Sequence, residues 1–171
     1  LTSGGTVRFS INNGPDNIKT KLEVDAEPYI TGDWVQVVAV RDTTARTTSL
    51  YANGVLMGST EETSGDISSG EPMWIGESTD ETNTAMSGDI KDVRLYNVNL
   101  TPSEINLKKK AQGITAQLVA HWPMDDGSGR PVADIVGDND GEIVGDNPPK
   151  WIDDGGLAFN NIDSNHVEVP H

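Results

Sequence analysis

The sequence predicts an all-β protein, folded as a two-sheet antiparallel β-sandwich. Short runs in which apolar and polar residues alternate, such as the one through Val7, Phe9 and Ile11, recur between clusters of Gly, Asn, Asp and Ser. This pattern is typical of short antiparallel strands joined by turns. A chain of 171 residues is long enough for one domain around one hydrophobic core.

At least eight strands are expected. The dense apolar run from Trp34 to Val40 has the composition of a central strand, and Leu50-Tyr51 leads into Asn53-Gly54, a strong hairpin signal. The other expected strands are 73–75, 90–96, 118–122, 157–159 and 167–169, with 7–11 at the start.

Only one helix is expected. Thr101 would cap its first turn, Pro102 would occupy its first position, and the helix would end by Gly113. A single short helix fits a sandwich or jelly roll, in which nearly all of the core comes from strands.

Composition limits the kind of partner. The chain has 27 Asp and Glu against 12 Lys and Arg, a net charge of -15, and no cysteine. This charge repels nucleic acid and anionic membrane surfaces, and it favours cations. The longest apolar run, around Val35 to Val40, is far too short to span a bilayer, which needs about 20 residues, so no membrane insertion is expected.

Two sets of motifs are more specific than the composition. The first set is TGDWVQVVAVRD (31–42), SLYANGVLMGS (49–59), EPMWIGE (71–77) and SGDIKDVRLYNVNLTPSEI (87–105). The second set is LVAHWPMDDGSGRPVADIVGDNDGEIVGD (118–146), PKWIDDGGLAFNN (149–161) and HVEVP (166–170). In order and residue types, the first set resembles the second half of a laminin G-like, concanavalin A-like jelly roll, and the second set resembles its opening half. The resemblance implies this fold for nearly the whole chain.

The two halves stand in reversed order. Residues 1–112 would form the C-terminal half, 113–117 a joint, and 118–171 the N-terminal half, either of one permuted sandwich or of two tandem copies. The family usually has further paired strands between the HVEVP-like and VRFSI-like motifs. We therefore expect strand donation between subunits, that is, self-association through missing strands, or a fragment of a longer protein.

A glycosidase is one alternative. Glu23, Asp25 and Glu27 resemble the E-x-D-x-E strand of laminarinases and lichenases, in which the first Glu is the nucleophile and the last is the general acid. Such catalysis needs two carboxyl groups about 5 to 5.5 Å apart. Pro28 interrupts the strand and the enzymes have a longer insertion before Trp34, so an acidic face exposed to solvent is the preferred interpretation.

Structural calcium is expected by resemblance. In the related folds an Asp on a late strand holds the ion together with carbonyl groups, and Asp92 stands in that place. Its neighbours would be Asp125, Asp126 and Asp163; the loop 134–140 is an alternative, in which Asp134 would rather cap the turn. The other interpretation of Asp92 is a pair with Arg94.

Trp74 and Glu77 are the candidate ligand-binding residues. Trp74 alternates with Ile75, so if Ile75 is buried Trp74 faces the other way, and Glu77 would share its face. By resemblance Trp34 and Trp122 belong to the core. Trp151 is expected to cover the core as a lid, and the three histidines are expected to be structural or surface residues.

Three function classes remain. The leading prediction is a non-catalytic binding module of an extracellular or cell-surface protein, with a carbohydrate as ligand and a protein surface as runner-up. The second is a structural or adhesive repeat that assembles by strand exchange. The third is a glycosidase that uses Glu23 and Glu27.

Overall fold

The computed structural model describes residues 5–12, 19–65, 72–77, 85–107, 117–162 and 164–170. The chain forms two compact units. Unit 1 contains residues 1–69 and 98–115, and unit 2 contains 70–97 and 116–171. The two units divide the chain differently from the two motif halves, since segment 70–97 belongs to unit 2. The interpretation of 1–112 and 118–171 as halves stays a prediction, and most of the joint 113–117 lies outside the described residues.

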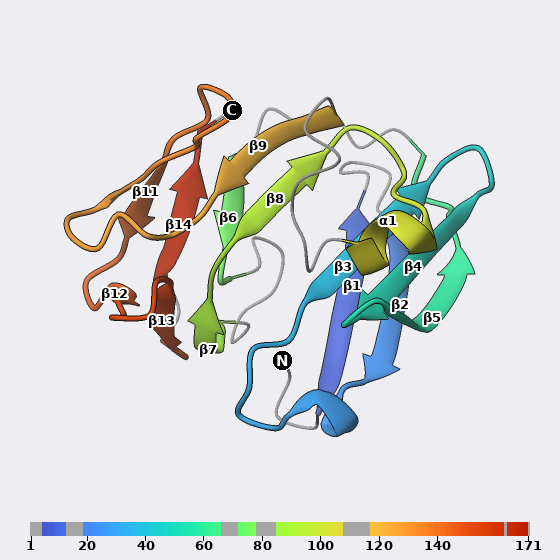
Figure 1. Cartoon of the computed structure of the whole chain (residues 1–171), viewed down its shortest axis with the longest axis horizontal. Helices are drawn as coiled ribbons and strands as arrows, with labels where there is room; N and C mark the ends of the chain where they lie inside the picture. Colours follow the sequence, from blue (N-terminus) through green and yellow to red (C-terminus); the bar gives the residue numbers. More distant parts are fainter. Residues whose placement is uncertain are drawn as a thin grey trace. The chain divides into compact units, whose positions relative to one another are not determined.

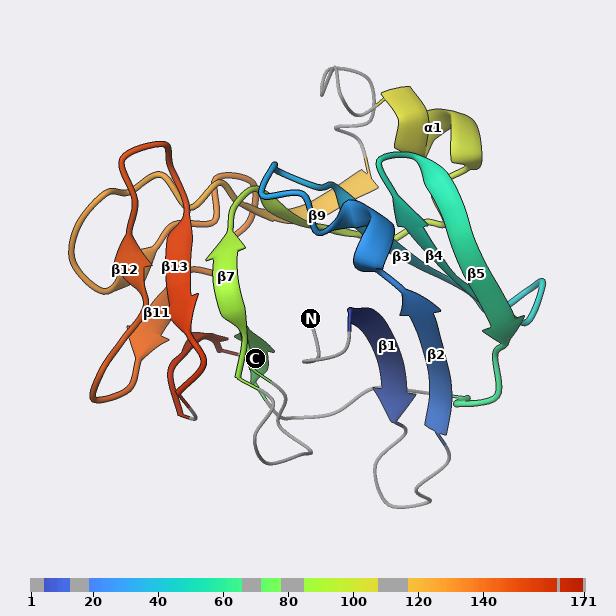
Figure 2. The ribbon, with the colours of Figure 1, turned by 90° about the horizontal axis from the view of Figure 1, so that it is seen from below.

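Unit 1 is built from antiparallel hairpins. One sheet pairs β1 with β2, and the other has the order β3-β4-β5 (Figures 1 and 2). Its core contains Leu22, Val24 and Leu50, which face inward because side chains alternate along the strands. The elements are β1 (Thr6–Asn12), β2 (Lys19–Asp25), a 3₁₀ helix (Glu27–Tyr29), β3 (Val37–Asp42), β4 (Thr47–Ala52), β5 (Val55–Glu61) and α1 (Pro102–Leu107).

The predicted turn at Asn53-Gly54 is confirmed. It joins β4 to β5, with Ala52 opposite Val55, and both turn residues have positive φ, 49° and 84°. Such angles match the twist of the flanking strands and favour Asn and Gly. The helix start is also confirmed: the Thr101 amide donates to the Glu104 side chain (2.7 Å), and the Glu104 amide donates back to Thr101 Oγ1 (3.3 Å).

In the described part of unit 2, three antiparallel sheets surround one core. Their orders are β10-β11-β14-β6, β12-β13-β7 and β8-β9, and Figure 2 shows β12, β13 and β7 side by side. The strands are β6 (Met73–Ile75), β7 (Ser87–Ile90), β8 (Val93–Tyr96), β9 (Leu118–Trp122), β10 (Pro131–Val132), β11 (Gly141–Val144), β12 (Lys150–Trp151), β13 (Leu157–Asn160) and β14 (His166–Val169). These sheets and the hairpins of unit 1 confirm the all-β sandwich class.

The core of unit 2 draws side chains from all three sheets. Trp122, Met124, Val132, Leu157 and Val167 are at most 1 % exposed. Trp122 is therefore a core residue, as predicted. Trp151 packs against the same cluster and covers part of it, which agrees with its expected role as a lid.

Two local expectations are wrong, and a third strand is shorter than the glycosidase motif requires. The strand predicted over 90–96 is broken into β7 and β8, because Asp92 has a φ of 57° that no strand residue adopts. The central strand begins at Val37 rather than at Trp34, a residue that is 44 % exposed instead of buried. The strand through Glu23 ends at Asp25, and Glu27 lies in a 3₁₀ helix with Pro28 at its start.

Candidate functional site

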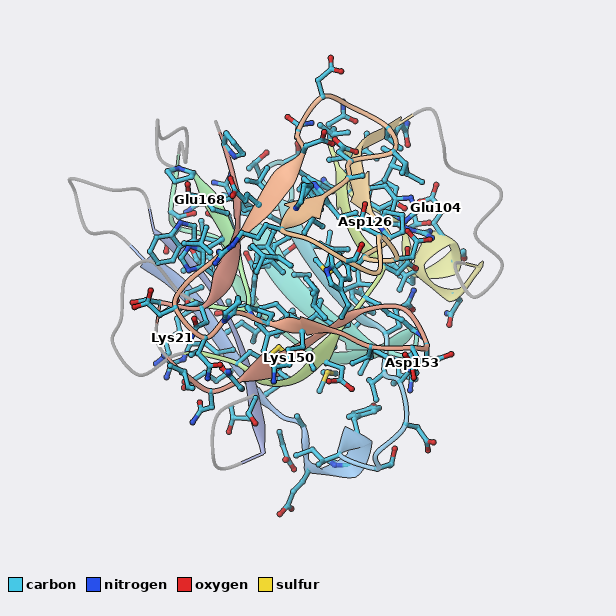
Figure 3. The ribbon with its side chains drawn as sticks, turned by 90° about the vertical axis from the view of Figure 1, so that its left-hand side faces the viewer. Lys21, Glu104, Asp126, Lys150, Asp153 and Glu168 are labelled. Atoms are coloured by element: carbon cyan, nitrogen blue, oxygen red, sulfur yellow. The ribbon has the colours of Figure 1, made fainter. Side chains whose placement is uncertain are left out.

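An aromatic and two acidic side chains form a row across three strands of unit 2. Trp74 on β6 lies opposite Glu168 on β14, and Glu168 lies opposite Glu142 on β11. Their strand neighbours Ile75, Val167 and Ile143 point into the core, so the row projects from the other face of the sheet. We call Trp74, Glu168 and Glu142 the outer row; Figure 1 shows β14 between β11 and β6, and Figure 3 labels Glu168.

The outer row offers part of each side chain to solvent. Trp74 is half-buried, Glu142 is exposed, and the Glu168 side chain is 42 % exposed. The prediction that Trp74 faces away from the core is confirmed, because Ile75 is only 8 % exposed on the core side.

His166 stacks on Trp74. The ring centroids are 3.9 Å apart and the planes differ by 18°. His166 shares a face with Glu168, two residues along β14, and only 4 % of it is exposed. The imidazole therefore supports one part of the indole and fixes its orientation.

Glu77 holds this histidine in place. Its two carboxylate oxygens share a bifurcated hydrogen bond from the Ser164 amide (2.9 and 3.0 Å), and the carboxylate lies 3.2 Å from His166 Nδ1. The Glu77 side chain is 8 % exposed. The structure thus brings the two predicted residues, Trp74 and Glu77, together around His166. The Glu77 carboxylate, however, is turned toward protein partners.

The preceding glycine determines where the Glu77 side chain lies. Gly76 has a φ of 97°, so the chain turns sharply at the end of β6. Its Cα lies so close to the Phe159 ring that a Cβ at this position would overlap it. A side chain is therefore excluded by both conformation and packing.

Two buried nitrogens of the site have no hydrogen-bond partner within the part of the chain that the structure describes. They are Trp74 Nε1 and His166 Nε2. The nearest carboxylate oxygen to His166 Nε2, Glu168 Oε2, is 4.0 Å away, too far for a hydrogen bond. A buried polar group left unpaired costs roughly 1 to 3 kcal/mol, so both atoms mark places where a further polar group would be stabilising.

The outer row carries two negative charges that no Lys or Arg side chain of the same sheet balances. Glu142 and Glu168 are directly opposite each other, an arrangement that destabilises a sheet when the charges are alike. The four strands of this sheet contain no Lys or Arg. Arg130, just before β10, donates instead to the carbonyl oxygens of Ile143 (2.7 Å) and Gly145 (3.4 Å).

The predicted calcium ligands are not gathered into one site. Asp92 Oδ1 accepts from Arg94 Nε (2.8 Å) and lies 2.7 Å from His121 Nε2. Asp125 and Asp126 are exposed, and Asp126 is 3.4 Å from the Ala133 amide, whereas Asp163 lies outside the described residues. Within the described ranges no three His, Asp or Glu side chains are close enough to hold a metal ion. Calcium stays a prediction.

Asp134 organises the loop that was the alternative calcium site. It accepts hydrogen bonds from the amides of His121 (2.8 Å), Val136 (3.0 Å) and Asn139 (3.3 Å), and from Asn139 Nδ2 (2.9 Å). Burial raises the pKa of Asp134, but these bonds outweigh burial and hold the pKa well below its usual range. Its carboxylate is therefore already hydrogen-bonded to the loop and to β9.

The candidate glycosidase residues are exposed, and they lie in two different elements, β2 and the 3₁₀ helix. Glu23 on β2 accepts from Arg8 (2.8 Å) and from Lys21 (3.1 Å), and bonds from Lys21 and Arg8 lower the pKa of Glu23. Asp25 ends the strand and its Oδ1 accepts from the Glu27 amide (2.9 Å). Glu23 and Glu27 therefore do not share one strand.

Sequence reasoning missed His166, Glu168 and Glu142. The alternation of His166-Val167-Glu168-Val169 places the first and third residues on one face, and this pattern is visible in the sequence. The pairing of β14 with β6 and β11 could not be predicted from the sequence, because it joins segments far apart in the chain.

The fold and the outer row define a β-sandwich protein with an aromatic and acidic sheet face. A family model described as the concanavalin A-like lectin/glucanases superfamily, of the laminin G type, matches residues 1–106. The chain belongs to this superfamily. No curated protein and no solved structure matches it. In the described part of the chain no helix is long and apolar enough to cross a membrane.

Proposed function

We propose that the chain is a non-catalytic carbohydrate-binding domain of an extracellular or cell-surface protein, and that the outer row binds the sugar. The observation that carries the proposal is the row itself, in which an indole stands beside two carboxylates on one sheet face. Aromatic rings stack on the apolar faces of sugars, and carboxylates accept hydrogen bonds from hydroxyl groups.

The dimensions of the row suit a short saccharide. Neighbouring strands are about 4.8 Å apart, so the backbones at Trp74 and Glu142 are separated by about 10 Å, the length of roughly two sugar rings. The stacked His166 and the hydrogen-bonded Glu77 fix the indole before the ligand arrives. Such pre-organisation lowers the entropy lost on binding.

A glycan array tests the proposal. The unmodified chain is expected to bind a set of glycans, and Trp74→Ala is expected to lose them while keeping the folded circular dichroism spectrum. Trp74→Phe, which retains an aromatic face, should keep part of the binding. The matched control is Trp34→Ala, which removes another partly exposed indole, in unit 1. Binding that survives Trp74→Ala and disappears in the control would contradict the proposed site.

The adhesive alternative predicts a different result. Strand exchange between subunits would give oligomers that grow with protein concentration in sedimentation experiments. Concentration-dependent oligomers without glycan binding would favour that function over ours.

A further inference from the structure

We infer that the preferred ligand of the outer row is a glycan with a free amine, held as an ammonium by Glu168 and Glu142. The inference rests on the proposed function, because it names the class of sugar that the same row would select. It is drawn from the hydrogen-bonding groups of the site that lack partners and from their charge.

Two unmet groups beside Glu168, His166 Nε2 and the Glu142 carboxylate, are hydrogen-bond acceptors. The carboxylate of Glu77 accepts only, so His166 Nδ1 carries a proton and, in the neutral ring, Nε2 is left with a lone pair. This nitrogen is buried, has no hydrogen-bond partner among the residues that the structure describes, and lies 4.0 Å from the Glu168 carboxylate. Glu142, the next carboxylate along the row, has no hydrogen-bond or ion-pair partner among the described residues. A ligand that fits these atoms must donate.

An ammonium group is the donor that also fits the charge. It has three hydrogen-bond donors and no acceptor, and its positive charge relieves the repulsion between Glu142 and Glu168. The hydroxyl oxygens of the same sugar can accept from Trp74 Nε1, which also lacks a partner within the described part of the chain.

Exposure decides where the ammonium first binds. Trp74 Nε1 and His166 Nε2 are covered, so a ligand reaches them only when a covering side chain turns away. Glu142 is exposed and the Glu168 side chain is 42 % exposed, so both meet the ligand directly. A sulfated or carboxylated glycan is repelled by the same two groups and by the net charge of -15.

Calorimetric titration with matched oligosaccharides tests the inference. The probes are a β-1,4-linked glucosamine oligomer, its N-acetylated counterpart and a heparin oligomer of equal length, at about pH 7, where unperturbed carboxyl groups are ionised and an unperturbed imidazole is mostly neutral. The glucosamine oligomer is expected to bind about tenfold more tightly than the acetylated one, and heparin is expected not to bind. The preference should shrink at high salt.

Two double variants of equal charge separate the row from general electrostatics. Glu142→Gln with Glu168→Gln should remove the preference for the amine, so that the glucosamine oligomer and its acetylated counterpart bind with equal affinity. Asp138→Asn with Asp153→Asn changes two exposed carboxylates of the same unit outside the row, and should keep the preference.

The outcomes distinguish the inference from the proposed function. Equal or tighter binding of the acetylated oligomer, lost in Trp74→Ala, would overturn the inference and leave the carbohydrate-binding function standing. Loss of the preference for the amine in the Asp138→Asn, Asp153→Asn control would also overturn the inference. If none of the three probes binds and the glycan array is empty, both fail.

Discussion

Replacing the buried Glu62 by Gln is expected to destabilise unit 1 strongly. Glu62 follows β5 and is 5 % exposed. Its carboxylate accepts from Thr48 Oγ1 (2.8 Å), from the amide of Ser64 (2.8 Å), from the Ser64 hydroxyl, and from Arg41 (3.2 Å). These bonds attach the chain after β5 to β3 and β4.

The magnitude follows from the pKa of Glu62. Burial raises this pKa, but hydrogen bonds from Ser64, Arg41 and Thr48 outweigh burial and lower the pKa from 4.5 to about 2. A lowered folded-state pKa means that the ionised carboxylate is stabilised by folding. The difference corresponds to roughly 3 kcal/mol in the free energy of unfolding at neutral pH. This contribution is complete above about pH 4.5 and is lost as the pH falls toward about 2.

Urea unfolding followed by tryptophan fluorescence measures the effect. Glu62→Gln keeps the shape of the side chain but removes its charge, so the variant should be less stable than the unmodified chain by about 3 kcal/mol at pH 7 and by only about 1 kcal/mol at pH 3. The matched control is the neighbouring Glu61→Gln, because the Glu61 side chain is 67 % exposed and pairs with Arg46 at 3.1 Å on the surface. That change should stay within about 0.5 kcal/mol.

Two results would refute this reasoning. If Glu62→Gln and Glu61→Gln lower the free energy of unfolding equally, the burial and hydrogen bonding of Glu62 do not contribute to stability. If the loss in Glu62→Gln is the same at both pH values, the carboxylate is not stabilised in its charged form.

Three further predictions concern the loop, calcium and catalysis. Asp134→Ala should lower the free energy of unfolding by about 2 to 4 kcal/mol in urea, because several part-buried donors lose their acceptor oxygens, whereas the exposed Asp138→Ala should change little. Calcium held at Asp92 should stabilise the folded chain by about 2.7 kcal/mol at a hundredfold excess over Kd and so raise the melting temperature, and Asp92→Asn should remove the gain; an unchanged melt with chelator would contradict the site. Glu23→Gln with Glu27→Gln should leave fold and glycan binding unchanged, and appreciable release of reducing ends from laminarin that vanishes in this variant would contradict a non-catalytic domain.

Local signals predicted the parts of the fold that depend on a few adjacent residues. The Asn53-Gly54 hairpin and the Thr101 cap are of this kind, since backbone angles and nearby hydrogen bonds decide them. The break at Asp92 was missed because its positive φ is adopted by a residue other than Gly. The two-residue strands β10 and β12 are too short to show a period.

The site was predictable only in part for a similar reason. The alternation of Trp74 with Ile75 gives the direction of the indole. Its neighbours His166 and Glu168 come from a strand more than 90 residues away, and no local pattern determines that pairing. The role of Glu77 depends on the turn at Gly76, which sends its carboxylate to Ser164.

The indole N–H resonances of the ¹⁵N-labelled chain test the central claim, that Trp74 binds the sugar, most directly. The chain has four tryptophans, and Trp74→Phe assigns one of their signals. Titration with a glycan that binds on the array should shift the Trp74 signal to saturation. The signals of Trp122 and Trp151, whose Nε1 atoms donate to the carbonyl oxygens of Asn139 (2.8 Å) and Gly129 (2.9 Å), should stay in place. A saturable shift of another indole with Trp74 unmoved would contradict the account.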